Sequence, residues 1–129
     1  MQEPSLAEFE TAARSVLLAL PAVFRDQLAD VVIRVAEFAE PEQLAAVGLT
    51  DRWELTGLYE GVPLPDRSQT DTAMMPPVIS LFRQPLLDEM DETGVSFESL
   101  VRHVVIHEAG HHFGFSDDDM HALEDGADD

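Results

Sequence analysis

The chain has 129 residues, enough for one ordinary domain, and 45% of them are hydrophobic, a share that can build a buried core. Its 26 acidic residues against 7 basic ones give a formal net charge of −19, which disfavours nucleic acid and anionic membranes as partners. The absence of cysteine excludes disulfides and thiolate ligands, so a metal ion would have to be held by His, Asp or Glu.

The N-terminal residues are acidic where a secretory signal carries basic residues, and no apolar run approaches the length of a membrane span. We therefore expect a cytoplasmic protein with a single domain over residues 1–129, of which about residues 126–129 form a frayed acidic tail. The sequence indicates no oligomeric state.

The first predicted element is an amphipathic helix over residues 5–20. It begins with a capping box formed by Ser5 and Glu8, its apolar residues recur at helical spacing, and Pro21 ends the pattern. After a short polar link, residues 31–38 form a short run rich in β-branched side chains, which predicts a strand.

The middle of the chain alternates short elements. Residues 41–47 begin with proline and precede a glycine, which predicts a short helix. Residues 54–60 and 78–83 are strand candidates, and residues 86–90 indicate another short helix. The proline-rich loop at residues 61–77 is long enough to be either a lid over a site or simply a flexible connection.

The strongest predicted helix starts at Ser96, with Ser99 as an alternative N-cap, and runs to a break at Gly114. Val101, Val105 and Ala109 recur every four residues along it, so we expect this helix to be central and largely buried.

The same helix carries a metal-binding pattern. His107 and His111 are four residues apart, which places their imidazoles one turn apart on the same face, where both can bind one ion. Glu108 follows His107 by about 100° around the helix and can reach a water on the ion without displacing a ligand. This HExxH spacing alone is a weak signal, because helices also pair Glu with His for other reasons.

A catalytic zinc ion takes three protein ligands and one water, so the two histidines leave one position to fill. Gly114 can end the helix in a left-handed turn, after which Asp117 could bring its carboxylate back to the ion. Asp117 also lies at the start of a last short helix predicted from Ser116, where a carboxylate is favoured without a metal, and Asp118 and Asp119 compete for the role. We predict one zinc ion held by the two histidines and Asp117.

Residues 107–117, HEAGHHFGFSD, fit the extended HExxHxxGxxD motif, and the chain resembles the small single-domain bacterial zincin-like metallopeptidases. The segments LTGLYEGVPLPDRS, PPVISLFRQPL and DDDMHALE also resemble that family, so the likeness covers about residues 27–125. It implies an α+β fold, the minimal zincin fold, in which a small mixed sheet packs against an N-terminal helix and a central active-site helix. It also implies zinc in a cleft beside the sheet and a peptide or protein substrate, without naming that substrate.

Four further side chains are candidates near the site. His112 points away from the preceding ligand and is interpreted as a packed or hydrogen-bonded histidine that supports the ligands. His103 lies one turn before the first ligand and could line the cleft, but a surface or core role is the favoured interpretation. His121 could stabilise an oxyanion if the last helix forms. Some zincins polarise the substrate carbonyl with a tyrosine, but for Tyr59 packing within the sheet is the favoured interpretation.

The working hypothesis is a zinc metalloendopeptidase in which Glu108 takes a proton from the zinc-bound water and delivers it to the leaving nitrogen. The substrate is expected to add as an extended strand at the sheet edge, for which residues 78–83 are the candidate. The alternative is a non-catalytic zinc-binding module that holds a peptide or protein partner in the cleft. Two histidines and a carboxylate also suit non-haem iron, but a glutamate beside the first histidine favours hydrolysis.

Overall fold

The computed structural model describes residues 3–61 and 76–114. Most of the loop predicted over residues 61–77 and the last helix predicted from Ser116 lie outside the described residues. The elements, with η marking a 3-10 helix, are α1 (Leu6–Leu18), α2 (Ala22–Arg25), η1 (Asp26–Leu28), β1 (Val32–Ala36), α3 (Pro41–Ala46), η2 (Arg52–Glu54), β2 (Gly57–Glu60), β3 (Val78–Phe82), α4 (Arg83–Thr93) and α5 (Phe97–Phe113).

The N-terminal helix α1 forms where the sequence predicts it. The Ser5 hydroxyl accepts a hydrogen bond from the Glu8 backbone N–H at 3.1 Å, and the Glu8 carboxylate accepts one from the Ser5 N–H at 3.1 Å, which completes the capping box. The link after Pro21 is more ordered than predicted. The Pro21 carbonyl accepts hydrogen bonds from the N–H groups of Phe24 and Arg25, which closes the single turn of α2.

The sheet has the order β1-β3-β2, so β3 is its central strand. Ile79 of β3 is opposite Ile33 in a parallel pair and opposite Tyr59 in an antiparallel pair, which makes the sheet mixed. The prediction that residues 78–83 form the open edge is therefore wrong. The continuous burial of this strand explains its place, because a central strand covered on both faces has no exposed side. The strand residues below 9% exposure are Ile79, Ser80, Leu81 and Phe82.

Two elements differ most from the sequence prediction in their boundaries. The strand predicted over residues 54–60 starts only at β2, because the Asp51 carboxylate accepts a hydrogen bond from the Trp53 N–H at 2.9 Å and starts the 3-10 turn η2. The helix predicted over residues 86–90 is longer, since α4 begins directly after β3 and ends at Gly94, whose φ of 73° is left-handed.

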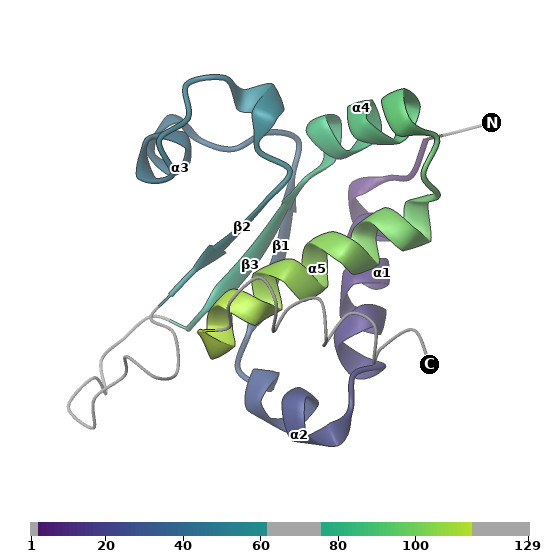
Figure 1. Ribbon diagram of the computed structural model, residues 1–129, viewed down its shortest axis with the longest axis vertical. Coiled ribbons are helices and arrows are strands. Elements are labelled where there is room, and N and C mark those ends of the chain that lie inside the picture. The colour runs from purple at the N-terminus through teal and green to yellow at the C-terminus, as the bar shows by residue number, and fades with distance from the viewer. Residues whose placement is uncertain (1–2, 62–75, 115–129) are drawn as a thin grey trace.

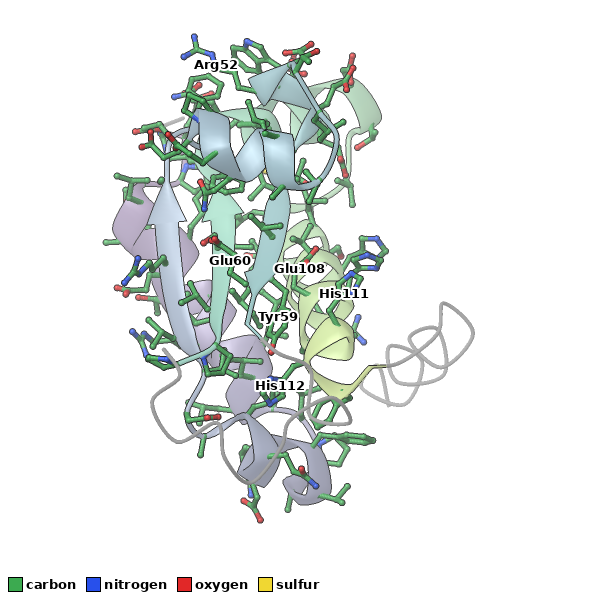
Figure 2. The ribbon with its side chains drawn as sticks, turned by 90° about the vertical axis from the view of Figure 1, so that its left-hand side faces the viewer. Arg52, Tyr59, Glu60, Glu108, His111 and His112 are labelled. Atoms are coloured by element: carbon green, nitrogen blue, oxygen red, sulfur yellow. The ribbon has the colours of Figure 1, made fainter. Side chains whose placement is uncertain are left out.

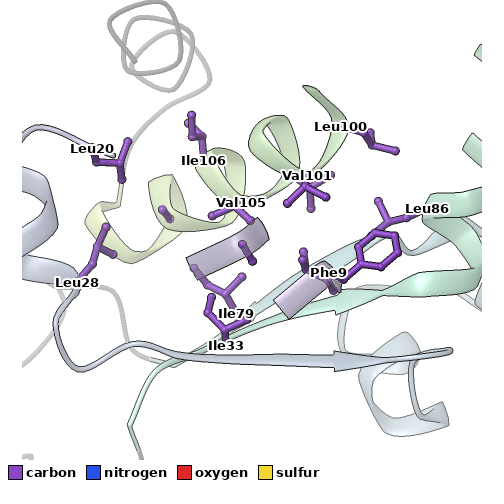
Figure 3. Packing of buried hydrophobic residues seen from close by; sticks show 14 of the residues in the cluster. Phe9, Leu20, Leu28, Ile33, Ile79, Leu86, Leu100, Val101, Val105 and Ile106 are labelled. Carbon is purple, nitrogen blue, oxygen red and sulfur yellow. The ribbon is translucent and has the colours of Figure 1, made fainter. Parts of the chain in front are cut away.

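The main core lies between the sheet and the helix pair α1 and α5. Phe9 of α1 meets Phe97 at the start of α5 edge-on, with ring centroids 4.9 Å apart. Figure 3 shows side chains of α5 facing those of the sheet across this core. The fully or nearly buried hydrophobic residues there are Phe9, Ala13, Leu20, Leu28, Ile33, Ile79, Leu81, Leu86, Leu87, Leu100, Val101, Val104, Val105, Ile106 and Ala109. Helix α5 is thus central and largely buried, as its periodicity predicts.

A second, smaller core lies on the other face of the sheet, where Leu58 and Phe82 pack with Ala39, Leu44 and Leu55 under α3 and η2. Figure 1 shows α3 at one end of the strands and α5 crossing the sheet. The arrangement is an α+β fold with a small mixed sheet, consistent with a minimal zincin fold. None of the helices within residues 3–61 and 76–114 has the length and apolar content needed to span a bilayer.

Candidate metal centre

The helix that carries the site has well-defined ends. The Ser96 hydroxyl accepts a hydrogen bond from the Ser99 N–H at 3.2 Å, as an N-cap does. At the other end Gly114 has a φ of 72°, in the left-handed region that glycine adopts without strain. Helix α5 therefore ends three residues after His111, at the glycine where the sequence predicts its break.

His107, Glu108 and His111 come together at the exposed side of α5, and their possible ligand atoms all lie within 4.8 Å of one another. The two imidazole centroids are 5.0 Å apart, and Nε2 of His111 is 3.9 Å from Oε1 of Glu108. His107 is half-buried, and His111 is exposed. Two imidazole nitrogens on one face of a helix with a carboxylate beside them are a donor set that suits Zn²⁺, so the described residues fit the ion that the sequence predicts.

Glu108 is the buried member of this cluster, with 8% of its surface exposed. Burial raises the pKa of its carboxyl from 4.5 to about 7, and a hydrogen bond from the Tyr59 backbone N–H partly opposes that rise. A carboxyl with a pKa near neutrality can both accept and return a proton at physiological pH. The side chain points toward β2 and lies next to Tyr59 (Figure 2).

Close approach of β2 to α5 depends on Gly57. A Cβ atom at this position would lie 2.6 Å from Cγ1 of Val104 and 3.6 Å from Cγ of Glu108. Only glycine leaves room for the strand to sit against this part of the helix. Gly57 was not predicted from the sequence, although an isolated glycine in a strand is a known sign of close backbone approach.

His112 is fully buried, whereas its neighbour His111, about 100° away around α5, is exposed. Its Nε2 lies 3.1 Å from the Gln27 carbonyl oxygen, so this nitrogen carries the proton and donates. Its Nδ1 then accepts a hydrogen bond from the Tyr59 hydroxyl, at 2.8 Å. Both ring nitrogens are engaged, which makes His112 a link between α5, β2 and η1. Figure 2 shows Tyr59 and His112 facing each other at this junction.

The sequence matches the model of one protein family, described as zincin-like metallopeptidase, over residues 28–127. The chain belongs to the zincin-like metallopeptidase family. Its fold places His107, Glu108 and His111 on α5, where their side chains converge. A comparison with curated proteins finds no match.

The remaining predicted positions are only partly described in this zincin-like chain. Asp117, its competitors Asp118 and Asp119, and His121 lie outside the described residues, so the third ligand stays a prediction. His103 is exposed and stacks on His107, with centroids 6.4 Å apart. It lines a pocket beside the metal centre, together with Glu89 of α4 and with Thr56, which directly precedes β2.

The same pocket contains a residue that sequence reasoning missed. Glu89 is on α4, and it meets the metal centre only because α4 folds back beside α5 (Figure 1). Nothing in the local pattern distinguishes it from the acidic residues around it on this helix, since all of them are typical of a solvated helix face.

Proposed function

We propose that this protein is a zinc-dependent peptidase in which His107, His111 and Asp117 hold one zinc ion and Glu108 acts as the general base. The observation that carries the proposal is the position of Glu108, a buried carboxyl that lies within 4.8 Å of two potential zinc ligands. Membership in the zincin-like metallopeptidase family supports the same reaction class.

Zinc, when bound, supplies a Lewis acid that polarises the peptide carbonyl and lowers the pKa of water. Glu108 takes the proton of the attacking water and returns it to the leaving nitrogen. The Tyr59 N–H holds the carboxylate in place, and the close packing of β2 at Gly57 limits water around it. A cation held by the two histidines would favour the charged carboxylate, so Glu108 would be able to act as a base at neutral pH.

The edge strand next to this centre is β2. The Thr56 carbonyl accepts a hydrogen bond from the Phe82 N–H at 3.0 Å, so in the antiparallel ladder the next residue, Gly57, directs its backbone groups away from β3. A groove of about 360 Å³ runs along this edge to Glu108 and His111. An extended peptide that pairs with β2 would bring its backbone beside the proposed base. β2 therefore replaces β3 as the strand proposed to pair with the substrate, because β3 is the central strand of the sheet.

The direct test combines metal analysis with peptide cleavage. Purified protein should contain about one zinc ion per chain and should cleave members of a diverse peptide pool, and a chelator should abolish cleavage. Glu108→Gln should retain zinc and lose at least about a hundredfold in rate, the usual contribution of general base catalysis. Glu98→Gln is the matched control, because Glu98 is exposed on the first turn of the same helix.

Zinc-loaded protein that cleaves no peptide would contradict the peptidase proposal and favour the non-catalytic zinc-binding module. Iron in place of zinc would contradict the choice of metal and favour oxygenase chemistry. Cleavage that persists in Glu108→Gln would remove Glu108 from its role as the base.

A further inference from the structure

A small pocket, here named the α4–α5 pocket, opens between these two helices at the start of β2. Its volume is about 260 Å³. The described residues that line it are Thr56, Glu89, His103, Val104, His107 and Glu108. Its lining residues on α5 run from His103 to Glu108, so the pocket lies on the N-terminal side of His111.

The position of the pocket ties it to the proposed reaction. His107 and Glu108 belong both to its wall and to the candidate metal centre, so a group that fills the pocket sits directly beside the reacting bond. The volume is slightly below the range of sites for whole small molecules, about 300 to 1,000 Å³, and suits one side chain of a longer substrate. Thr56 in the wall directly precedes β2, so a peptide paired with β2 passes the mouth of the pocket.

The charge of the pocket selects the kind of side chain. Glu89 is half-buried and is the α4 residue in the wall, and the lining given by the described residues includes no Arg. Glu108 adds a second carboxyl, but the proposed chemistry already uses it. A carboxylate that is partly shielded from water attracts a cation more strongly than a fully exposed one does. Glu89 is therefore a counter-ion placed to meet a positive group that enters from the cleft.

We propose that the α4–α5 pocket receives an arginine or lysine side chain adjacent to the cleaved bond, and that Glu89 selects it. This inference rests on the proposed function for the cleavage, but the binding of a basic side chain stands independently of it. Val104 supplies an apolar wall for the methylene groups of the substrate side chain, and Glu89 meets its charged end. The substrate class is thus a peptide with a basic residue at one fixed position.

The test must separate Glu89 from the general attraction of a chain with a charge of −19 for any basic peptide. The matched control is Glu92→Gln, which removes one charge from an exposed site on the same helix. The probes are alanine-based hexapeptides with a single arginine, or with citrulline, its uncharged isostere. Binding is measured by fluorescence anisotropy on zinc-loaded protein in a Glu108→Gln background, so that cleavage does not consume the probe.

The arginine peptide should bind about tenfold more tightly than the citrulline peptide, a ratio in the range of close charge pairs at interfaces. Glu89→Gln should reduce this ratio to nearly one, and Glu89→Asp, which keeps the charge, should retain part of it. Glu92→Gln should leave the ratio unchanged. Two results would overturn the proposal: equal affinities for the arginine and citrulline peptides when Glu89 is present, or a preference for the arginine peptide that Glu89→Gln leaves unchanged.

A cleavage experiment on wild-type protein distinguishes the two proposals. Mass spectrometry of products from a peptide pool should show arginine or lysine enriched at one position next to the cut, and Glu89→Gln should remove the enrichment. Cleavage without any enrichment would overturn the pocket assignment alone. Selective binding of the arginine peptide without cleavage of any peptide would overturn the peptidase assignment and support the pocket. Absence of both selective binding and cleavage would overturn both proposals.

Discussion

The Tyr59 hydroxyl, on the edge strand β2, donates a hydrogen bond of 2.8 Å to Nδ1 of His112 on α5. The backbone N–H of the same tyrosine donates to the carboxylate of Glu108, one helical turn earlier on α5. One residue of the strand therefore fixes two positions of the helix, and these positions flank the exposed His111. The orientation of the proposed base and the register of β2 on α5 depend on each other.

Tyr59→Phe should destabilise the protein by about 1 to 3 kcal/mol, because it leaves the buried Nδ1 of His112 without its donor. Urea denaturation measures the change. The control is a double-mutant cycle with His112→Phe, in which the hydroxyl has no ring nitrogen to bond. The loss from Tyr59→Phe should be much smaller in that background. Additive losses would show that the hydrogen bond contributes no stability.

Gly57→Ala should cost about 1 to 3 kcal/mol of stability, since the new Cβ would lie 2.6 Å from Cγ1 of the buried Val104. The variant should also cleave more slowly, because β2 must shift away from Glu108. Thermal or urea unfolding and the cleavage rate test the two parts. Adding Val104→Ala removes the clashing atom, so the glycine substitution should cost less in that background. An equal cost in both backgrounds would contradict the steric explanation.

The stability of the metal-free protein should depend on pH through Glu108. Its pKa is raised from 4.5 to about 7 on folding, so its contribution to stability is fully present below pH 4.5 and is lost as the pH rises toward 7. The loss should total roughly 3 kcal/mol at about 1.4 kcal/mol per pKa unit. Urea denaturation with a chelator present, compared between wild-type and Glu108→Gln, isolates this group from the other carboxylates.

Glu108→Gln should therefore gain stability over the wild-type protein between pH 4.5 and 7, with little further gain above pH 7. Zinc should reduce the difference, because a cation beside the carboxylate favours its charged form. The same pH dependence in both proteins would show that burial does not raise the pKa of Glu108.

Asp117→Asn should lower the affinity for zinc at least about tenfold, because even the loss of a residue that only hydrogen-bonds to a metal ligand costs that much. Competition with a chromophoric chelator measures the affinity. Asp118→Asn and Asp119→Asn change the charge by the same amount and are the matched controls. If one of these two weakens zinc binding and Asp117→Asn does not, the third ligand has been assigned to the wrong aspartate.

Local sequence patterns were sufficient to predict helices α1 and α5 and the histidine pair at the centre of the site. The capping box of α1, the start of α5 at Ser96 and its end at Gly114 all depend on residues within one or two turns of each other. The spacing of His107 and His111 places both on one face of a helix, whatever else the chain does. Such features can be predicted from the sequence because the interactions that form them are local.

The order of the strands and the surroundings of the site were decided by tertiary structure. Residues 78–82 form a nearly continuous apolar run, which is typical of a buried strand, but the strands that pair with it lie far away in the sequence, and the open edge was assigned wrongly. Tyr59 and His112 are 53 residues apart, and their hydrogen bond exists only because β2 packs on α5. The raised pKa of Glu108 and the place of Glu89 beside it have the same origin. Burial and charge proximity are set by distant segments brought together in the fold, which no local pattern encodes.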